Sequence, residues 1–263
     1  MLNFNRANSL TATVKSLPYL VVVAALFPIA ACAADAPVPP PDTLSASEIL
    51  DRSAATYRSL RSYADEGTVV TSVEGSPSPL KSLEFQTRFA QGGRLRFAYH
   101  DVAYGGMTTR YALLIENGRA TVKSSLSGED GNTKDAVDAV AEVTGVSDGA
   151  AYTIPAVLLP AVAWKRETWL SAPKAQRIDD GIERGIHCYR VERRSPIDSH
   201  RALSAVDAAY GVVTVYWIAM DSALLLRTDR DVHLDGRRLN IETQYTPAAN
   251  TEIQAGAFGL AWY

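Results

Sequence analysis

The chain has 263 residues, of which 47% are hydrophobic and 21% charged, and a formal net charge of −3 at pH 7. This length suits one or two globular domains, and sandwiches, barrels and their open relatives often reach it as a single domain. The near-neutral charge, with Lys and Arg scattered along the chain, gives no support for nucleic-acid binding.

Residues 1–31 have the layout of an export signal. Arg6 and Lys15 supply positive charge without acidic residues, and the apolar stretch 17–30 that follows is too short to span a bilayer comfortably. It ends at Ile29-Ala30-Ala31-Cys32, which resembles the lipobox of bacterial lipoproteins, where the signal is cut before the cysteine and the cysteine is acylated. We therefore expect Cys32 to be the lipidation site and several acyl chains to anchor the protein stably.

Two further features bear on where the chain is expected. If Cys32 is acylated, Ala33 occupies the lipoprotein-sorting position, and the Gram-negative pattern implies the periplasmic face of the outer membrane. The alternative is ordinary cleavage at the A-x-A site Ala31-Cys32-Ala33, which gives a soluble periplasmic chain. Residues 32–44 are rich in proline and predict an extended tether, so the folded domain is expected over 45–263.

The folded part begins with a predicted helix and continues with strands. Ser45 and Glu48 form a capping box, and apolar residues recur at helical spacing over 46–61. Asn117-Gly118 is the preferred pair for a tight hairpin turn. Strands are predicted, from period-two alternation and turn residues, at 63–73, 82–90, 94–101, 111–115 and 119–125.

The middle of the chain changes character. Residues 127–134 are polar and Gly-rich and predict a loop, whereas 135–143 are rich in Ala and Val and predict a helix. Residues 154–160 predict a short apolar helical segment with Pro155 in its first turn. Helices inserted between two groups of strands are placed to cover one face of a sheet.

A hairpin over 212–230 is the most distinctive part of the second half. Its first strand is apolar on both faces, whereas an antiparallel strand with one wet face alternates apolar and polar residues. We infer that its second face is covered or borders an apolar cavity. Further strands are predicted at 177–182, 186–194 and 237–246.

Roughly ten antiparallel strands and few helices predict an α+β domain that is mostly antiparallel β, with one sheet curled by its own twist. Several segments also resemble the LolA/LolB-like superfamily of bacterial outer-membrane lipoprotein carriers and their periplasmic relatives, over residues 46–258. The segments that carry the resemblance are 57–63, 85–89, 93–97, 185–191, 215–218, 224–227 and 245–250, with Phe258 near the end. The resemblance implies an unclosed half-barrel with a helical lid over an apolar cavity that holds acyl chains.

Candidate residues for a hydrophobic-ligand cavity are the large apolar residues at inward strand positions and one in the apolar helical segment. They are Phe85, Phe97, Tyr99, Leu113, Leu158, Tyr216 and Trp217. For any single residue, filling of a dry core is an equally good interpretation. The collective case depends on the excess of apolar strand faces over the expected cover.

Other motifs have structural interpretations. Gly145-Val146-Ser147-Asp148-Gly149 matches the nucleophile-elbow pattern, but it follows a predicted helix in a chain without βαβ alternation, so we expect a loop. Four separate histidines, His100, His187, His200 and His233, lack metal-ligand spacing. Cys188 has no partner once Cys32 is acylated or removed, and is expected to be a small core residue. No cofactor, metal or catalytic group is expected.

The leading hypothesis is an exported cell-envelope protein that binds a hydrophobic ligand, acyl chains of lipid or lipoprotein first. Tethering through Cys32 would prevent shuttling, which is a departure from the soluble carriers. The alternative is an envelope sensor or scaffold whose groove binds a protein segment. The remote alternative is a hydrolase that uses Ser147.

Cys32→Ser should release the protein from membrane pellets, because the substitution removes the thiol that carries the acyl anchor. Fractionation of envelopes from cells that express each form measures this. An unchanged distribution would contradict the lipoprotein assignment.

Overall fold

The computed structural model describes residues 43–101, 108–125, 130–159, 168–171, 174–195, 211–234 and 236–260. The predicted signal, Cys32 and nearly all of the tether lie outside these ranges, so their assignments remain predictions. Within the described part, no helix combines the length and apolar character needed to span a bilayer.

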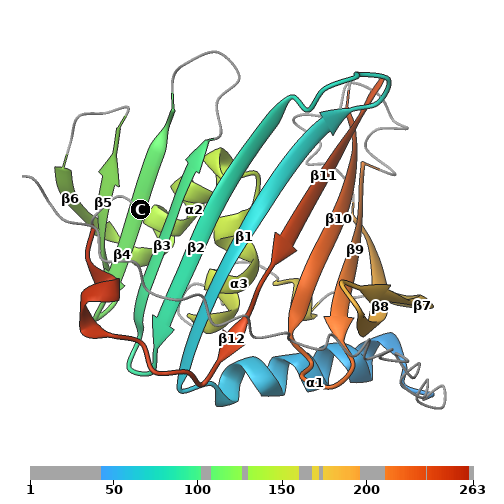
Figure 1. The fold of residues 1–263 in the computed structure, drawn as a ribbon, viewed down its shortest axis with the longest axis horizontal. Helices are drawn as coiled ribbons and strands as arrows, with labels where there is room; N and C mark the ends of the chain where they lie inside the picture. The colour runs from blue at the N-terminus through green and yellow to red at the C-terminus, as the bar shows by residue number, and fades with distance from the viewer. Residues whose placement is uncertain are drawn as a thin grey trace, which may run out of the picture. The chain divides into compact units, whose positions relative to one another are not determined.

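Helix α1, Ala46–Ser59, begins at the predicted capping box. The Glu48 amide donates to Ser45 Oγ at 3.3 Å, and the Ser45 amide donates to Glu48 Oε2 at 2.7 Å. The helix docks on the turn after strand β9 through its buried face: Ser53 Oγ donates to the Ala223 carbonyl, and the Tyr57 hydroxyl accepts from the Leu225 amide. The helix lies across one end of the sheet (Figure 1).

One antiparallel sheet contains all the strands that the structure describes. Their bounds are β1 Ser62–Val73, β2 Lys81–Ala90, β3 Arg94–Asp101, β4 Arg110–Glu116, β5 Arg119–Ser124, β6 Asp130–Asp135, β7 Gln176–Glu183, β8 Ile186–Ser195, β9 Val212–Ala219, β10 Leu225–Leu234, β11 Arg237–Tyr245 and β12 Ala248–Ala249. Along the sheet the order is β6-β5-β4-β3-β2-β1-β11-β10-β9-β8-β7, and β12 pairs with β1.

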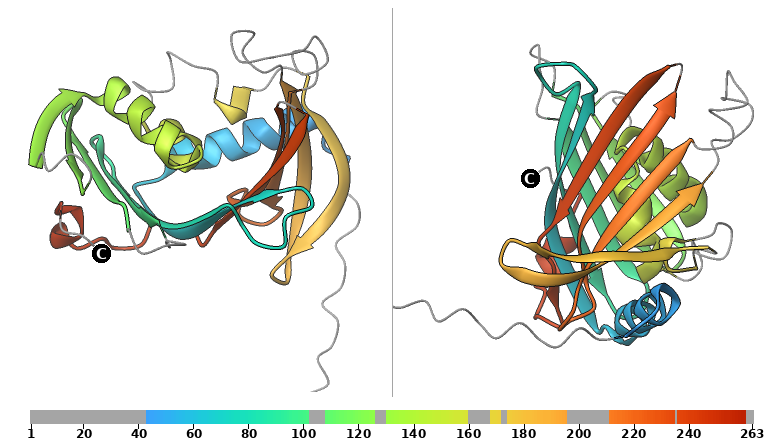
Figure 2. Two further views of the ribbon diagram at one scale, coloured as in Figure 1. Left: turned by 90° about the horizontal axis from the view of Figure 1, so that it is seen from above. Right: turned by 90° about the vertical axis from the view of Figure 1, so that its right-hand side faces the viewer.

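This order consists of two meanders, β1–β6 and β7–β11, that are joined where β1 pairs with β11. The two end strands, β6 and β7, do not pair with each other, so the sheet is an unclosed, strongly curved half-barrel (Figure 2). The predicted fold class is confirmed.

Two helices lie in the connection between the meanders. Helix α2, Ala136–Val146, packs over β4, β5 and β6, and α3, Ala150–Leu158, packs over β2 and β3. They occupy the hollow of the curved sheet, which is the lid position that the resemblance implied (Figure 2). The short 3₁₀ helices η1, Trp169–Ser171, and η2, Ala255–Phe258, complete the regular structure of the described residues.

Two local predictions in this connection were wrong. Residues 130–134, expected as a loop, belong to β6, an edge strand that pairs only with β5 and therefore needs no apolar alternation of its own. Pro155 lies inside α3 rather than in its first turn, because the helix begins at Ala150, where the Ser147 hydroxyl accepts the Ala151 amide at 3.1 Å.

A row of aromatic residues crosses the seam between the meanders on the concave face. Tyr245 of β11, Gly67 of β1, Phe85 of β2, Tyr99 of β3 and Tyr111 of β4 are register partners in turn. Because residue 67 has no side chain, the Phe85 ring reaches across β1 and meets the Tyr245 ring edge-on, with centroids 5.5 Å apart. A glycine within a strand, covered by a neighbouring aromatic ring, is a known way of building a bend into a sheet.

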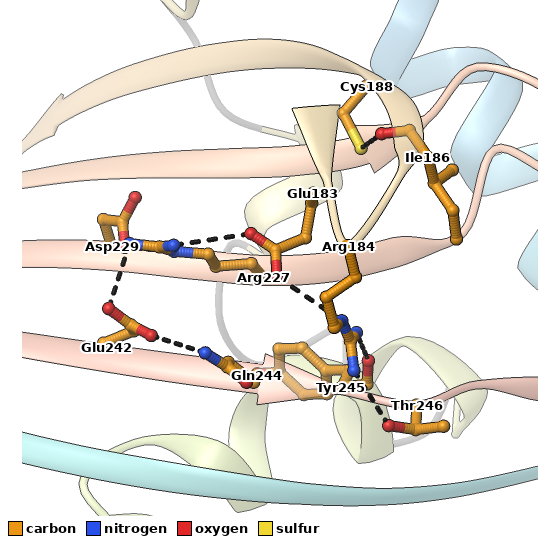
Figure 3. A network of polar contacts seen from close by, with 10 residues as sticks. All are labelled: Glu183, Arg184, Ile186, Cys188, Arg227, Asp229, Glu242, Gln244, Tyr245 and Thr246. Atoms are coloured by element: carbon orange, nitrogen blue, oxygen red, sulfur yellow. Dashed lines mark hydrogen bonds and ion pairs between the residues drawn. The ribbon is translucent and has the colours of Figure 1, made fainter. Parts of the chain in front are cut away.

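The convex face of β8–β10 carries a polar network around an aromatic ring. Arg227 forms ion pairs with Asp229 at 2.7 Å, Glu242 at 2.9 Å and Glu183 at 3.4 Å (Figure 3). Arg184 of the β7–β8 turn reaches the Tyr245 carbonyl and the Thr246 hydroxyl. These contacts hold the β7–β8 turn against the outside of β11.

Gly67→Ala should lower the free energy of unfolding by about 1–3 kcal/mol or more, because the added Cβ would collide with the Phe85 ring and the Gln244 carbonyl oxygen. Urea denaturation measures the loss. Gly256→Ala is the matched control: its Cβ would meet no atom within 4 Å, so its effect should stay within about 0.5 kcal/mol. Equal effects of the two changes would contradict the role given to Gly67.

Candidate functional site

Four of the predicted cavity residues form one apolar surface on the concave face. Phe85, Phe97 and Leu113 are at most 1% exposed and Tyr99 is 2% exposed. The Phe85 and Phe97 rings stack with centroids 5.8 Å apart. We call this surface, on strands β2–β4, the apolar bed. Leu158 of α3 is also buried, in the same core cluster.

The last two predicted cavity residues lie on opposite faces of β9. Tyr216 faces the hollow, where its ring stacks on Trp169 of η1 with centroids 5.2 Å apart. Trp217 lies on the convex face with Cys188 and Ala219, and its indole nitrogen donates to Asp229 at 2.7 Å. The apolar second face of β9 is therefore covered by a compact aromatic and charged layer, and the helices cover the first.

The inner face of the lid is made of small side chains. The buried lid residues are mainly alanine and valine: Ala136, Ala139, Val140 and Val143 of α2, and Ala150, Ala151, Ile154 and Ala156 of α3. Small apolar side chains bury little area each, so the lid covers the apolar bed with modest apolar contact per residue.

Ser147, the serine of the nucleophile-elbow pattern, lies in the α2–α3 turn. It is fully buried, and its hydroxyl caps α3 by accepting the Ala151 amide. The predicted loop at this position is a helix–helix turn, with Asp148 and Gly149 at φ 51° and 94°. A buried hydroxyl already used as a cap is not presented to a substrate, so the geometry gives the hydrolase alternative no support.

The α2–α3 turn is attached to three strands through Asp148. The Thr71 hydroxyl of β1 donates to Asp148 Oδ2 at 2.8 Å, and Lys81 Nζ of β2 lies 3.6 Å from the same oxygen. Arg230 Nη2 of β10 donates to the Asp148 carbonyl at 2.7 Å. Polar contacts, rather than large apolar side chains, therefore hold this corner of the lid on the sheet.

A cavity of about 160 Å³ remains between this turn and strands β8–β11. Its walls are the start of α3, the Trp169 and Tyr216 rings, and a set of polar residues from the sheet. The sheet residues that line it are Arg193, Thr214, Tyr216, Thr228, Arg230, Ile241 and Thr243. We call it the polar cavity, because two arginines and three threonines face into it.

These polar residues were missed by the sequence reasoning. Thr214 lies between Val212 and Tyr216 and so had to share their face, but a threonine among valines gave no signal of its own. Arg230 was assigned only as the end of a strand. Its inward direction depends on the irregular register between Leu225 and Arg227, which sequence alternation does not reveal.

Two wider depressions lie elsewhere. One of about 350 Å³ lies between α1, the end of α3 and η1, with Ala54, Val157 and Leu170 among its lining residues. The other, of about 260 Å³, is on the convex face beside Arg184. Within the described ranges, no group of three or more His, Cys, Asp or Glu side chains is placed to hold a metal ion.

One ionisable group is buried in the floor of the hollow. Asp65 of β1 is 1% exposed, and its carboxylate accepts from the Tyr63 hydroxyl and the Thr87 amide, each at 2.9 Å. Burial raises its pKa to about 6 in spite of these hydrogen bonds and the nearby Arg88. The group therefore changes its charge near pH 6 without leaving the core.

No protein-family model and no curated protein matches the chain. Solved structures with a similar fold include the lipoprotein LppX of Mycobacterium tuberculosis, with TM-score 0.43 and 14% identity over 80% of this chain and 97% of that one. Another is MucB bound to MucA from Pseudomonas aeruginosa, with TM-score 0.44 and 16% identity over 82% of this chain and 61% of that one. A LolA superfamily protein of Nitrosomonas europaea has TM-score 0.37 and 11% identity, over 82% and 98%. These likenesses concern the fold alone.

Asp65→Asn should change how stability depends on pH. Because the folded pKa of about 6 lies above the ordinary 3.8, the folded state binds a proton between these values, so wild-type stability falls as pH rises from 4 towards 6 and above. The variant lacks this contribution, so its stability relative to wild type should increase over that interval. Denaturation of both proteins at several pH values measures the difference, and a constant difference would contradict the shifted pKa.

Proposed function

We propose that this chain is an exported, membrane-tethered binding protein that takes up an apolar ligand, acyl chains first, between the apolar bed and the α2–α3 lid. The observation that carries the proposal is the buried aromatic and aliphatic bed covered by a lid of small side chains. A dry core needs no such division, because large interlocking side chains on both sides would fill it with more contact.

The energetics favour exchange of the lid for a ligand. Moving the lid off the bed gives up contacts of alanine and valine side chains, each of which buries little area. An acyl chain that replaces them contributes about 0.8 kcal/mol per buried methylene, or about 8 kcal/mol for ten of them. Binding of this kind needs no catalytic group.

The closed arrangement limits what fits without movement. An engineered cavity of about 150 Å³ takes up benzene, so the polar cavity, at about 160 Å³, has room for a small group and not for a long chain. Uptake of a chain therefore requires α2 and α3 to separate from β2–β6. The polar contacts of Asp148 are the described contacts that must yield or swing with the lid.

The tether sets where this binding would take place. Acylation at Cys32 and the proline-rich segment 32–44 would hold the half-barrel beside the periplasmic face of the outer membrane, close to a source of acyl chains. If Cys32 is instead removed with the signal, the same domain would act as a soluble periplasmic binder.

A second candidate is an envelope sensor or scaffold that binds a protein segment. Ile182 and Ile186, which flank the β7–β8 turn, are 61% and 39% exposed, and β7 is an edge strand. An extended segment of a partner would pair with such an edge and cover apolar residues beside it. Lipid that co-purifies with the native protein would favour the first candidate.

Tyr216→Ala and Trp217→Ala form a matched pair, because the residues are adjacent in sequence and lie on opposite faces of β9. Tyr216→Ala should weaken uptake of a fluorescent fatty acid about fivefold or more, because it removes an aromatic wall of the hollow. Trp217→Ala should lower stability by about 2–4 kcal/mol and leave uptake unchanged.

Fluorescence titration measures uptake, and denaturation of the same samples measures stability. Uptake that follows stability in both variants, or lipid-free native protein that takes up no fatty acid, would contradict binding in the hollow.

A further inference from the structure

We propose that the polar cavity holds the anionic head of the ligand, a carboxylate or a phosphate group, and that Arg230 is the residue that recognises it. This deepens the proposed function and rests on it: the same ligand would place its head in the polar cavity and its apolar part on the bed. The argument starts from how Arg230 is buried.

Arg230 carries a charge in a place where few groups answer it. Its guanidinium lies against Gly149 and donates through Nη2 to the Asp148 carbonyl. Its buried Nε has no hydrogen-bond partner, and it forms no ion pair with a carboxylate, among the residues that the structure describes. Burial lowers the pKa of the guanidinium, which reflects the same cost of removing it from water.

The nearest acidic group does not serve as its counter-ion. The Asp148 carboxylate is taken up by Thr71 and Lys81, on the side of β1 and β2, and only its backbone carbonyl faces Arg230. A buried charge without a close partner is costly. An anion in the cavity would supply that partner.

The strand register adds further donors around the same point. Arg193 of β8, Thr214 of β9 and Arg230 of β10 are register partners in one row across the sheet. In the next row, Thr228 of β10 faces Thr243 of β11. Two guanidinium groups and three hydroxyls thus line one small space, and all of them can donate to an oxyanion.

The rest of the wall decides the ligand class. Trp169, Tyr216 and Ile241 line the cavity together with the polar groups. The cavity is too small for a chain and large enough for a head group, and its apolar wall belongs to the same continuous core as the bed. An anionic amphiphile fits both parts, whereas a free inorganic anion would use only the polar one.

The test compares dodecanoate with dodecanol, the same chain with and without an ionised head, at pH 8. Displacement of a fluorescent apolar probe measures both affinities, and a thermal shift with inorganic phosphate tests a free anion. Arg230→Gln should weaken dodecanoate binding about tenfold, equivalent to about 1.4 kcal/mol, and leave dodecanol binding unchanged. Arg190→Gln, the same charge change on the convex face over Trp217, should alter neither.

Because Arg230 also touches the lid turn, a second variant keeps the charge and the turn intact. Thr228→Val is nearly isosteric and should weaken dodecanoate binding severalfold with no effect on dodecanol. Stabilisation by phosphate that is lost in Arg230→Gln would support the anion site and identify a free anion as a further source of the recognised group.

The outcomes separate the inference from the proposed function. Equal affinity for dodecanoate and dodecanol, unchanged in Arg230→Gln and Thr228→Val, would overturn the head-group site and leave apolar binding standing. Failure of the wild-type protein to bind either chain would overturn the proposed function itself.

Discussion

The pairing of β1 with β11 is the constraint on which the rest of the structure depends. It joins the first strand of the fold to its last long one, across 7 register pairs from Gly67–Tyr245 to Val73–Leu239. Without it, two separate meanders would each expose an apolar face. With it, they form one curved surface, and Gly67 lets the aromatic row continue over the seam through Phe85 and Tyr245.

The curvature that this seam permits explains the position of the lid. The connection between the meanders must return from β6 at one edge to β7 at the other, and the hollow is the side that it crosses. Helices α2 and α3 cover the β2–β6 half, while Trp169 reaches Thr153, Tyr57 and Tyr216 near the other half. The small polar cavity remains where these two covers meet.

Much of this architecture could be predicted from the sequence, because alternation, turn residues and caps are local signals. The strand over 94–101 and the box at Ser45 were predicted as found. Strand β6 was not, since an edge strand needs no alternation. The site was predicted only in part: inward aromatic residues such as Phe97 follow from alternation, but the position of Arg230 depends on a register irregularity, and the different surroundings of Tyr216 and Trp217 depend on tertiary packing.

The hollow therefore has two unlike halves, and their difference follows from what covers each. Over β2–β4 the alanine and valine faces of the helices meet aromatic rings, so water is excluded and charge is absent from the inner rows except at Asp65. Over β8–β11 the cover is incomplete, and the inward rows carry Arg193, Arg230 and threonines, which would be costly under a tight apolar lid. A sheet that needed only stability would have an apolar second half as well. Retaining buried guanidinium groups beside an apolar bed is the arrangement expected where one end of a bound molecule differs in charge from the other.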